Sequence, residues 1–476
     1  MLLLLNHTRI AGIIGVSILA LIVDIGRSTA QPNPVITVDV SRTIGRLKHL
    51  GGVNAGPGNS VAGYRDAGIT LVRTHDLYGP TDYHYYFPQF FDTQLDIANP
   101  DNYAWESSDA RIAAIVENGF QAYIRLGISW PSERRNTPTQ PPANPGTINN
   151  FSRFAELCRR TVLHYNTGWA NGHRYNIRYW EIWNEPDGRF WDGTPQQFYT
   201  MYETVARFLK ELDPTLQVGG PAITGGSVSN PQRTAYSKEF LRFCREHNVP
   251  LDFFSWHCYA RSIDFDPWKV RAMALRVRQW LDAEGFTGTE SHLNEINIDL
   301  GRSRNPDLNS PTGAAFVAAT LIALQDSPVD KLMWYRGQGH SMGIIEDDAG
   351  SEPRHKWNGL PFKAAARQYQ ETPIRVLTTG QDTTQTLLAL AGKSEHSNRI
   401  SVLVTNYRNP AKKITVNIGN HSLSAGEIPV TITRIAGPDQ RYNTTTKTVP
   451  VSEYIQIELE NADAPSVHLI ELIPSR

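Results

Sequence analysis

Apolar runs of strand length alternate with amphipathic, helix-period segments through most of the chain. Eight short runs rich in branched and aromatic residues are expected to be strands: 50–54, 70–75, 121–129, 178–184, 217–222, 253–259, 291–297 and 331–335. Helical periodicity is found between or after them, in 150–165, 196–211, 233–247, 267–284, 311–325 and 358–369. Eight strands separated by helices predict an α/β fold, a (β/α)8 TIM barrel, over residues 49–371.

The pattern changes at about residue 372. The apolar runs become short and alternating and are separated by Gly, Pro and Asn, in 386–391, 399–406, 413–418, 429–435, 453–459 and 466–472. This pattern predicts a C-terminal β-sandwich accessory domain over residues 372–476. A strand-like run at 35–40, within residues 31–48, precedes the barrel and is expected to join the sandwich.

The first thirty residues have the layout of an export signal. An apolar stretch, 11–25, follows His7 and Arg9, and Ser28-Thr29-Ala30 supplies the small residues that a signal peptidase reads. We expect residues 1–30 to be a signal peptide and the mature protein to be secreted or periplasmic, with no stable membrane partner after cleavage. An uncleaved membrane anchor is the alternative.

Composition narrows the classes of partner. The chain has 476 residues, of which 40% are hydrophobic and 20% charged, as in a globular protein. Its 46 basic and 47 acidic residues nearly cancel, which argues against nucleic acid as a partner. Three cysteines, Cys158, Cys244 and Cys258, allow at most one disulfide, and burial as small apolar side chains is expected. The His257-Cys258 pair lacks the further ligands of a zinc site, so neither a metal nor a cofactor is expected.

Two glutamates at predicted strand ends carry the candidate chemistry. Glu185 follows an apolar strand in the run Trp-Glu-Ile-Trp-Asn-Glu-Pro-Asp, residues 180–187, where Pro186 blocks continuation of a central strand. Glu295 lies inside the apolar run 291–297, and a carboxylate within a buried strand indicates a paired or functional group. On the strand count these are the ends of the fourth and seventh strands, whose side chains converge over a barrel mouth. Two facing carboxyl groups, one protonated and one ionised, are what glycoside hydrolysis requires.

Several motifs together carry a family resemblance. They are Gly51-Gly52-Val53-Asn54, Val72-Arg73-Thr74-His75, Trp183-Asn184-Glu185-Pro186-Asp187, Val218-Gly219-Gly220-Pro221, Asp252-Phe253-Phe254-Ser255-Trp256-His257 and His292-Leu293-Asn294-Glu295-Ile296-Asn297. In this order, with a β-sandwich attached, the chain resembles the retaining (β/α)8 glycoside hydrolases, and among them family 39, which contains β-xylosidases and α-L-iduronidases.

The resemblance implies roles for individual residues. Glu185 matches the general acid/base, Glu295 the nucleophile, and Asn184 the residue that hydrogen-bonds the sugar 2-hydroxyl. Arg73 is expected to keep Glu295 ionised, whereas burial and the second carboxylate should raise the pKa of Glu185. Further positions match the lining of the first sugar subsite, with a tryptophan as its apolar floor: His75, His257, Tyr259 and Trp334. The expected partner is an oligosaccharide or polysaccharide.

The presence of Arg336 leaves the identity of the sugar in the substrate undecided. It shares a predicted strand face with Trp334, so its guanidinium is placed to receive a sugar carboxylate and would favour a uronic acid over a plain xyloside. Pairing with a protein carboxylate such as Glu346 or Asp347 is the alternative. A non-catalytic extracellular carbohydrate-binding protein on the same scaffold is the other class of function to be tested.

Overall fold

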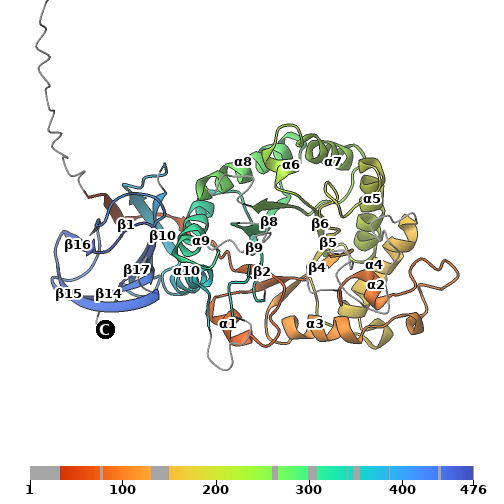
Figure 1. The fold of residues 1–476 in the computed structure, drawn as a ribbon, viewed down its shortest axis with the longest axis horizontal. Coiled ribbons are helices and arrows are strands. Elements are labelled where there is room, and N and C mark those ends of the chain that lie inside the picture. Colours follow the sequence, from red (N-terminus) through yellow and green to blue (C-terminus); the bar gives the residue numbers. More distant parts are fainter. Residues whose placement is uncertain are drawn as a thin grey trace, which may run out of the picture.

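The structure is a computed structural model in which residues 33–75, 79–129, 150–259, 266–298, 308–339, 341–346, 354–384, 386–437 and 441–474 are described. The expected signal peptide lies outside the described residues. Figure 1 shows a barrel ringed by helices and, beside it, a second β-rich body. The two bodies meet along helices α9 and α10, residues Pro311–Ala323 and Leu360–Glu371.

The barrel is closed by eight parallel strands and confirms the predicted fold. In chain order these are β2 (Gly52–Asn54), β3 (Leu71–Arg73), β4 (Gln121–Leu126), β5 (Tyr179–Ile182), β6 (Gln217–Ile223), β7 (Phe253–Tyr259), β8 (Glu290–Asn297) and β9 (Lys331–Trp334). Val53 on β2 pairs with Trp334 on β9, which closes the ring. The other barrel helices are α1 (Val61–Asp66), α2 (Tyr83–Tyr86), α3 (Glu106–Val116), α4 (Phe151–Asn166), α5 (Pro195–Leu212), α6 (Gly226–Ser229), α7 (Ala235–Glu246) and α8 (Pro267–Ala283).

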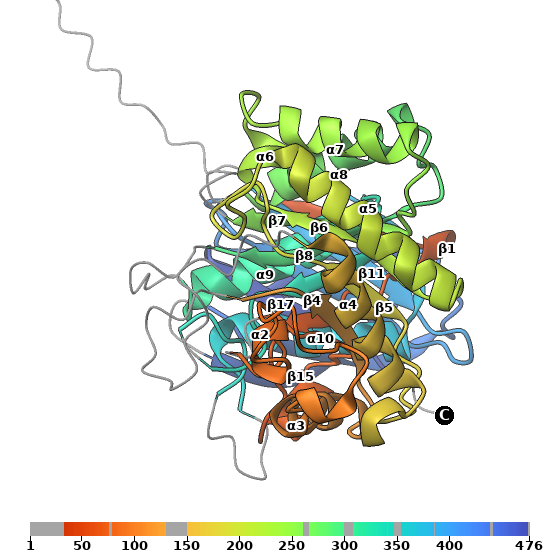
Figure 2. The ribbon, with the colours of Figure 1, turned by 90° about the vertical axis from the view of Figure 1, so that its right-hand side faces the viewer.

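Helix α5 shows how the local sequence specifies these elements. Thr194 caps its N-terminus and forms a reciprocal capping box with Gln197, while Pro195 occupies the first turn, where its missing N–H costs nothing. Its buried side chains recur at helical spacing and face the barrel: Phe198, Met201, Tyr202, Val205 and Leu209. Figure 2 shows α5 running along the outside of the strands.

The barrel interior is built in layers by the two-residue period of the strands. A buried cluster forms the lower layer: Leu71, Tyr123, Tyr179, Phe253 and Met333. Two residues further along the same strands, and on the same side of each strand, come polar side chains that are fully buried: Arg73, Arg125, Glu181 and Ser255. The apolar layer thus supports a polar layer directly below the carboxyl ends of the strands.

The second body is a nine-stranded, mostly antiparallel sheet with the order β15-β14-β17-β12-β11-β10-β1-β13-β16. Its strands are β1 (Val35–Arg46), β10 (Ile374–Thr379), β11 (Leu387–Lys393), β12 (Ile400–Asn406), β13 (Ile414–Gly419), β14 (Gly426–Ala436), β15 (Arg441–Val451), β16 (Tyr454–Leu459) and β17 (Ser466–Leu472). β1 pairs antiparallel with β10 and parallel with β13, so a segment that precedes the barrel is an internal strand of the sheet. Val430 on β14 and Ile457 on β16 share one apolar core although their strands lie near opposite ends of the order, so the sheet folds over itself as a sandwich.

Helices α9 and α10 join the two bodies. Every residue of α9 from Gly313 to Ala323 is buried, because the helix packs against the barrel on one side and the sheet on the other. Gln368 on α10 donates from Nε2 to the carbonyl of Leu390 at 2.8 Å. The side chains of Arg367 and Glu471 form an ion pair at 2.7 Å across the same interface.

All three cysteines are buried and free, which confirms their expected state as small apolar side chains. Among the residues that the structure describes, none of the helices has both the length and the apolar character needed to cross a membrane.

Candidate active site

The chain turns sharply where β5 ends. Trp183 and Glu185 both adopt left-handed backbone conformations, with φ of 73° and 44°, on either side of Asn184. The Trp183 N–H donates to the carbonyl of Leu126 at 2.7 Å, and the Glu185 N–H donates to that of Ala222 at 2.9 Å. The turn is therefore held by the ends of the neighbouring strands β4 and β6. Backbone conformations that are costly for residues with a Cβ concentrate at functional sites.

Arg73 organises the polar layer beneath this turn. Its fully buried guanidinium donates to Glu181 Oε2 at 2.6 Å, to Asn184 Oδ1 at 2.8 Å and to Glu295 Oε1 at 2.7 Å. A further donation goes to Asn54 Oδ1 at 2.9 Å. One cation thus fixes the orientation of four side chains from three other strand regions, and the carbonyl oxygen of Asn184 already accepts a hydrogen bond from it.

Glu295 is held by donors on both oxygens. Arg73 donates to Oε1, and the Tyr259 hydroxyl donates to Oε2 at 2.7 Å. Burial raises the pKa of Glu295 above 4.5, and the nearby Glu185 adds to the rise, whereas His257, Arg73 and Tyr259 lower it. Arg73 therefore acts in the expected direction, but burial outweighs it.

Glu185 has a different environment. Its Oε1 lies 2.7 Å from His257 Nδ1 and no guanidinium donates to it among the described residues. Burial, and then the negative charge of Asp187, raise the pKa of Glu185 to about 8. Because burial also lowers the pKa of His257, the imidazole is neutral and one proton lies between the two groups near neutral pH. The predicted upward shift of Glu185 is found.

The two glutamates are close. One oxygen of Glu185, one oxygen of Glu295 and a nitrogen of His257 all lie within 4.8 Å of one another. Retaining glycosidases hold their carboxyl groups about 5–5.5 Å apart, while inverting ones leave about 6.5–9.5 Å for a water molecule. The same three groups have the spacing of metal ligands. Both oxygens of Glu295 already accept hydrogen bonds, however, which disfavours a cation there.

His75 lies on the other side of Glu295. Its Nε2 is 3.5 Å from Glu295 Oε1, and its buried Nδ1 has no hydrogen-bond partner among the described residues. Burial, and then the positive charge of Arg73, hold the pKa of His75 well below 6.5, so the ring is neutral. Two aromatic side chains that the sequence did not single out complete this wall: Phe190, whose ring centroid is 6.2 Å from that of His75, and Tyr335, 6.3 Å from Tyr259.

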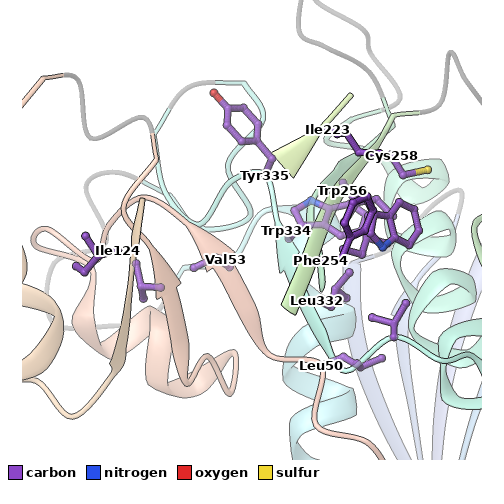
Figure 3. Close-up of a cluster of buried hydrophobic side chains, with 14 of the residues drawn as sticks. Leu50, Val53, Ile124, Ile223, Phe254, Trp256, Cys258, Leu332, Trp334 and Tyr335 are labelled. Carbon is purple, nitrogen blue, oxygen red and sulfur yellow. The ribbon is translucent and has the colours of Figure 1, made fainter. Parts of the chain in front are cut away.

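Trp334 does not line the site, which corrects the prediction. Its side chain is fully buried and packs against Phe316 of α9 and Phe362 of α10, with ring centroids 6.2 and 5.9 Å away. Figure 3 shows it in the apolar cluster with Trp256 and Leu332. The preceding residue of β9, Met333, belongs to the interior cluster, so by alternation Trp334 faces outward between strand and helices rather than into the mouth.

Arg336 lies beyond the end of β9, where strand alternation no longer applies, so it does not share a face with Trp334. Its side chain is 6% exposed. Its charge contributes to the low pKa of His75, after burial and after Arg73, Arg125 and His257, so the guanidinium lies within electrostatic reach of that ring. The two residues that were expected to act together are therefore separated.

Two further acidic residues of the motif around Glu185, Glu181 and Asp187, hold the site in place through hydrogen bonds. Glu181 is fully buried and accepts from Arg73, Ser255 and Asn294, so it anchors the polar layer. Asp187 accepts from the backbone N–H of Thr224 at 3.0 Å, and from the hydroxyls of Thr224 and Ser227 at 2.5 Å each. Sequence reasoning missed Asp187 as a site residue, although its position two residues after Glu185 was a signal.

The fold and the site together define a (β/α)8 barrel protein with a carboxylate pair, an arginine and two neutral histidines at the barrel mouth. The chain belongs to glycosyl hydrolases family 39, whose family model matches residues 64–336, more than half of the chain.

Individual relatives match over shorter segments. The chain is 40% identical over 193 residues to a β-xylosidase of Geobacillus stearothermophilus, covering 36% of each protein. It is 33% identical over 137 residues to the α-L-iduronidase of Homo sapiens, covering 26% of this chain and 20% of that one. The matched segments thus span about a third or less of these relatives. A glucosidase from Croceicoccus marinus has the same fold, with a TM-score of 0.77 and 23% identity over 94% of this chain and 100% of that one.

Proposed function

We propose that this protein is a retaining glycoside hydrolase of the β-xylosidase type, with Glu295 as nucleophile and Glu185 as general acid/base. The observation that carries the proposal is a pair of carboxyl groups within 4.8 Å in unlike environments. Glu295 receives a guanidinium and a phenol, which stabilise its ionised form, and Glu185 is held protonated near neutral pH by burial and by Asp187.

The two environments suit the two halves of a double displacement. In the first half, a Glu295 oxygen bonds to the anomeric carbon while Glu185 gives its proton to the departing glycosidic oxygen. In the second half, Glu185, now ionised, takes a proton from water, whose oxygen bonds to the anomeric carbon and releases Glu295. Each step conserves the proton, and Glu185 ends protonated as it began.

Asn184 and Arg73 support the reaction through position. Because Arg73 occupies the carbonyl oxygen of Asn184, the Asn184 amide group is oriented with its N–H donors available to a ligand. A donor held at a sugar 2-hydroxyl strengthens its bond as positive charge develops at the anomeric carbon, which lowers the barrier. No reorganisation is needed when substrate enters, since these groups are fixed before binding.

Replacing each glutamate separately tests the assignment. Glu185→Ala should lose most activity on aryl glycosides with poor leaving groups and regain part of it with azide, which attacks without a base. Glu295→Ala should be nearly inactive on every substrate. Glu156→Ala on the surface of α4 is the control and should keep full activity. Proton NMR of the first-formed sugar should show retained configuration; inverted product would rule out this mechanism, and absence of hydrolysis by the parent enzyme would favour a binding protein.

The sugar accepted at the first subsite is tested separately. A xyloside is the main proposal because the relative at 40% identity over 193 residues is a β-xylosidase. A uronide is the second candidate, because the Arg336 charge reaches His75 beside Glu295. Initial rates on aryl β-xylosides, arabinosides, galactosides and α-L-iduronides distinguish them. If a uronide is preferred, Arg336→Met should abolish that preference while leaving xyloside hydrolysis measurable; if xylosides are preferred and Arg336→Met leaves the ranking unchanged, the uronide proposal fails.

We also infer that residues 1–30 direct export and are removed. The support is the apolar stretch 11–25 and the small residues before Gln31. Intact-mass analysis of the protein expressed in full should give a chain that begins at Gln31 outside the cytoplasm. A full-length chain retained in the membrane fraction would instead support the anchor.

A further inference from the structure

Two histidines and an aspartate converge on the outside of the barrel, away from the carboxylate pair. Asp109 lies in the first turn of α3, His164 in the last turn of α4, and His173 in the loop between α4 and β5. One ligand-type atom from each lies within 4.8 Å of the others. His164 Nε2 is 2.9 Å from Asp109 Oδ1, and His173 Nε2 is 3.6 Å from Asp109 Oδ2.

The hydrogen bonds of His164 require either a proton or a metal ion at its contact with Asp109. Its Nδ1 lies 2.9 Å from the carbonyl oxygen of Trp169, which can only accept, so Nδ1 carries a hydrogen. In the neutral ring, Nε2 then bears a lone pair, and this lone pair points at a carboxylate oxygen. Two lone pairs at 2.9 Å repel unless a proton or a metal ion lies between them. An imidazole whose second nitrogen donates to a backbone carbonyl is the usual arrangement of a metal-bound histidine.

The loop that carries His173 is shaped to bring it to this point. The His173 N–H donates to the carbonyl of His164 at 2.7 Å, and the Tyr175 N–H donates to that of Tyr165 at 2.9 Å, so the loop folds back along the end of α4. Gly172 allows the close approach, since a Cβ there would lie 2.2 Å from the His164 carbonyl oxygen and 2.6 Å from its Nδ1. A side chain at this position would push His173 away from Asp109.

The surroundings suit a cation as well. The His164 ring is stacked on Trp105, with centroids 3.9 Å apart and planes 10° from parallel. The face of an indole attracts a positively charged ring, whether the charge comes from a proton or from a bound metal. His164 is 1% exposed, whereas Asp109 and His173 are 25% and 27% exposed, so an ion can enter from solvent and keep water as further ligands.

We propose that Asp109, His164 and His173 form a binding site for a divalent transition metal such as Zn²⁺. Two imidazoles and one carboxylate without thiolate are typical ligands of zinc and of its first-row neighbours. Bonds of about 2.0–2.1 Å meeting at about 90–120° place ligand atoms about 2.9–3.6 Å apart. The two distances to Asp109 lie in this range and each runs to a different oxygen, so the carboxylate would present both oxygens to the ion. The metal would tie α3, α4 and the loop that leads into β5, the strand that ends at Glu185.

Zinc binding is measured on the full chain, freed of any affinity tag and treated with EDTA. Isothermal titration with ZnCl₂ should show one site, and Zn²⁺ should raise the thermal unfolding midpoint where Mg²⁺ at equal concentration does not. His173→Ala and Asp109→Asn should each weaken zinc binding by about 100-fold or more, since loss of an outer-shell partner alone costs about 10–100-fold. The zinc-induced rise in midpoint should disappear in both variants, while their midpoints in EDTA change little.

His247→Ala is the matched control. That histidine also faces a carboxylate, Glu203 at 3.4 Å, and stacks on an aromatic ring, Phe243 at 4.1 Å, but belongs to no described group of three ligands. It should bind zinc as the parent does. The proposal is overturned if the parent binds no zinc, if Mg²⁺ stabilises it equally, or if His173→Ala retains the zinc response; His164 and Asp109 would then be an ordinary buried ion pair.

Discussion

Removal of the Tyr259 hydroxyl tests how the nucleophile is kept ionised. The hydroxyl donates to Glu295 Oε2 at 2.7 Å, and both side chains are buried, so water does not replace the lost donor easily. Tyr259→Phe deletes one oxygen and keeps the ring beside Tyr335. The hydrogen bond favours the charged form of Glu295, so its loss must raise a pKa that burial has already raised.

The size of the effect follows from the type of bond. A hydrogen bond to a charged group contributes about 1.5–3 kcal/mol, and one pKa unit corresponds to about 1.4 kcal/mol. The pKa of Glu295 should therefore rise by about 1–2 units. The same donor stabilises the carboxylate as it leaves the sugar in the second half-reaction, so that step should slow by about 10- to 150-fold.

Initial rates on an aryl xyloside between pH 4 and 9 supply the measurement. The acid limb of kcat/KM, which reports ionisation of the nucleophile in the free enzyme, should move to higher pH by about 1–2 units. On a substrate with a very good leaving group, kcat should fall more than kcat/KM above that limb. Tyr199→Phe is the control, because this buried hydroxyl on α5 donates to the Tyr236 carbonyl at 3.0 Å and touches neither glutamate.

Two outcomes would refute the reasoning. An acid limb that stays in place while Tyr259→Phe remains folded would mean that Glu295 is not the group that titrates there. An equal shift in Tyr199→Phe would assign the effect to general loosening of the barrel rather than to the donor.

Three further outcomes are expected. Asp187→Asn should lower the pKa of Glu185 and move the basic limb of kcat/KM from about 8 to lower pH. The expected shift is about 1–3 pH units, because like charges about 4–12 Å apart interact by about 1.4–4 kcal/mol at an effective dielectric of about 20. An unmoved limb would contradict the role of Asp187. Glu185→Gln should raise the calorimetric melting temperature. The folded-state pKa of Glu185 lies above its unfolded value of 4.5, so the stability that Glu185 contributes is lost as pH rises from about 4.5 to 8. The rise in melting temperature should therefore be small near pH 4.5 and grow towards pH 8. Trp334→Ala should cost about 3–5 kcal/mol in urea unfolding because it empties a buried volume, and it should leave the substrate ranking unchanged; a changed ranking with little loss of stability would return Trp334 to the sugar site.

The sequence was sufficient where local patterns and global fold agree. All eight barrel strands were predicted because each is a short apolar run between turn or helix signals. Glu185 and Glu295 stood out because the carboxyl ends of the strands in such a barrel all face the mouth where ligands bind. β15 was missed, since residues 443–448 are all polar and give no alternation of apolar and polar positions, and the segment forms its strand by pairing with β14. β10 was missed as well, in a segment that follows the last barrel helix directly.

Tertiary structure alone decided which side chains meet. Arg73 joins Glu181, Asn184 and Glu295 across the barrel because closing the ring brings their strands together, and no spacing along the chain records that distance. Trp334 was expected to stack on a sugar because it is a tryptophan near a strand end, yet it faces the helices because the preceding Met333 faces the barrel interior. The sequence also predicted no metal ligands, because Asp109, His164 and His173 belong to three separate segments. Packing α3 against the end of α4, and folding the next loop back through Gly172, brings them together. Contacts of this kind depend on how helices pack and loops return, which the local pattern of apolar and polar residues does not encode.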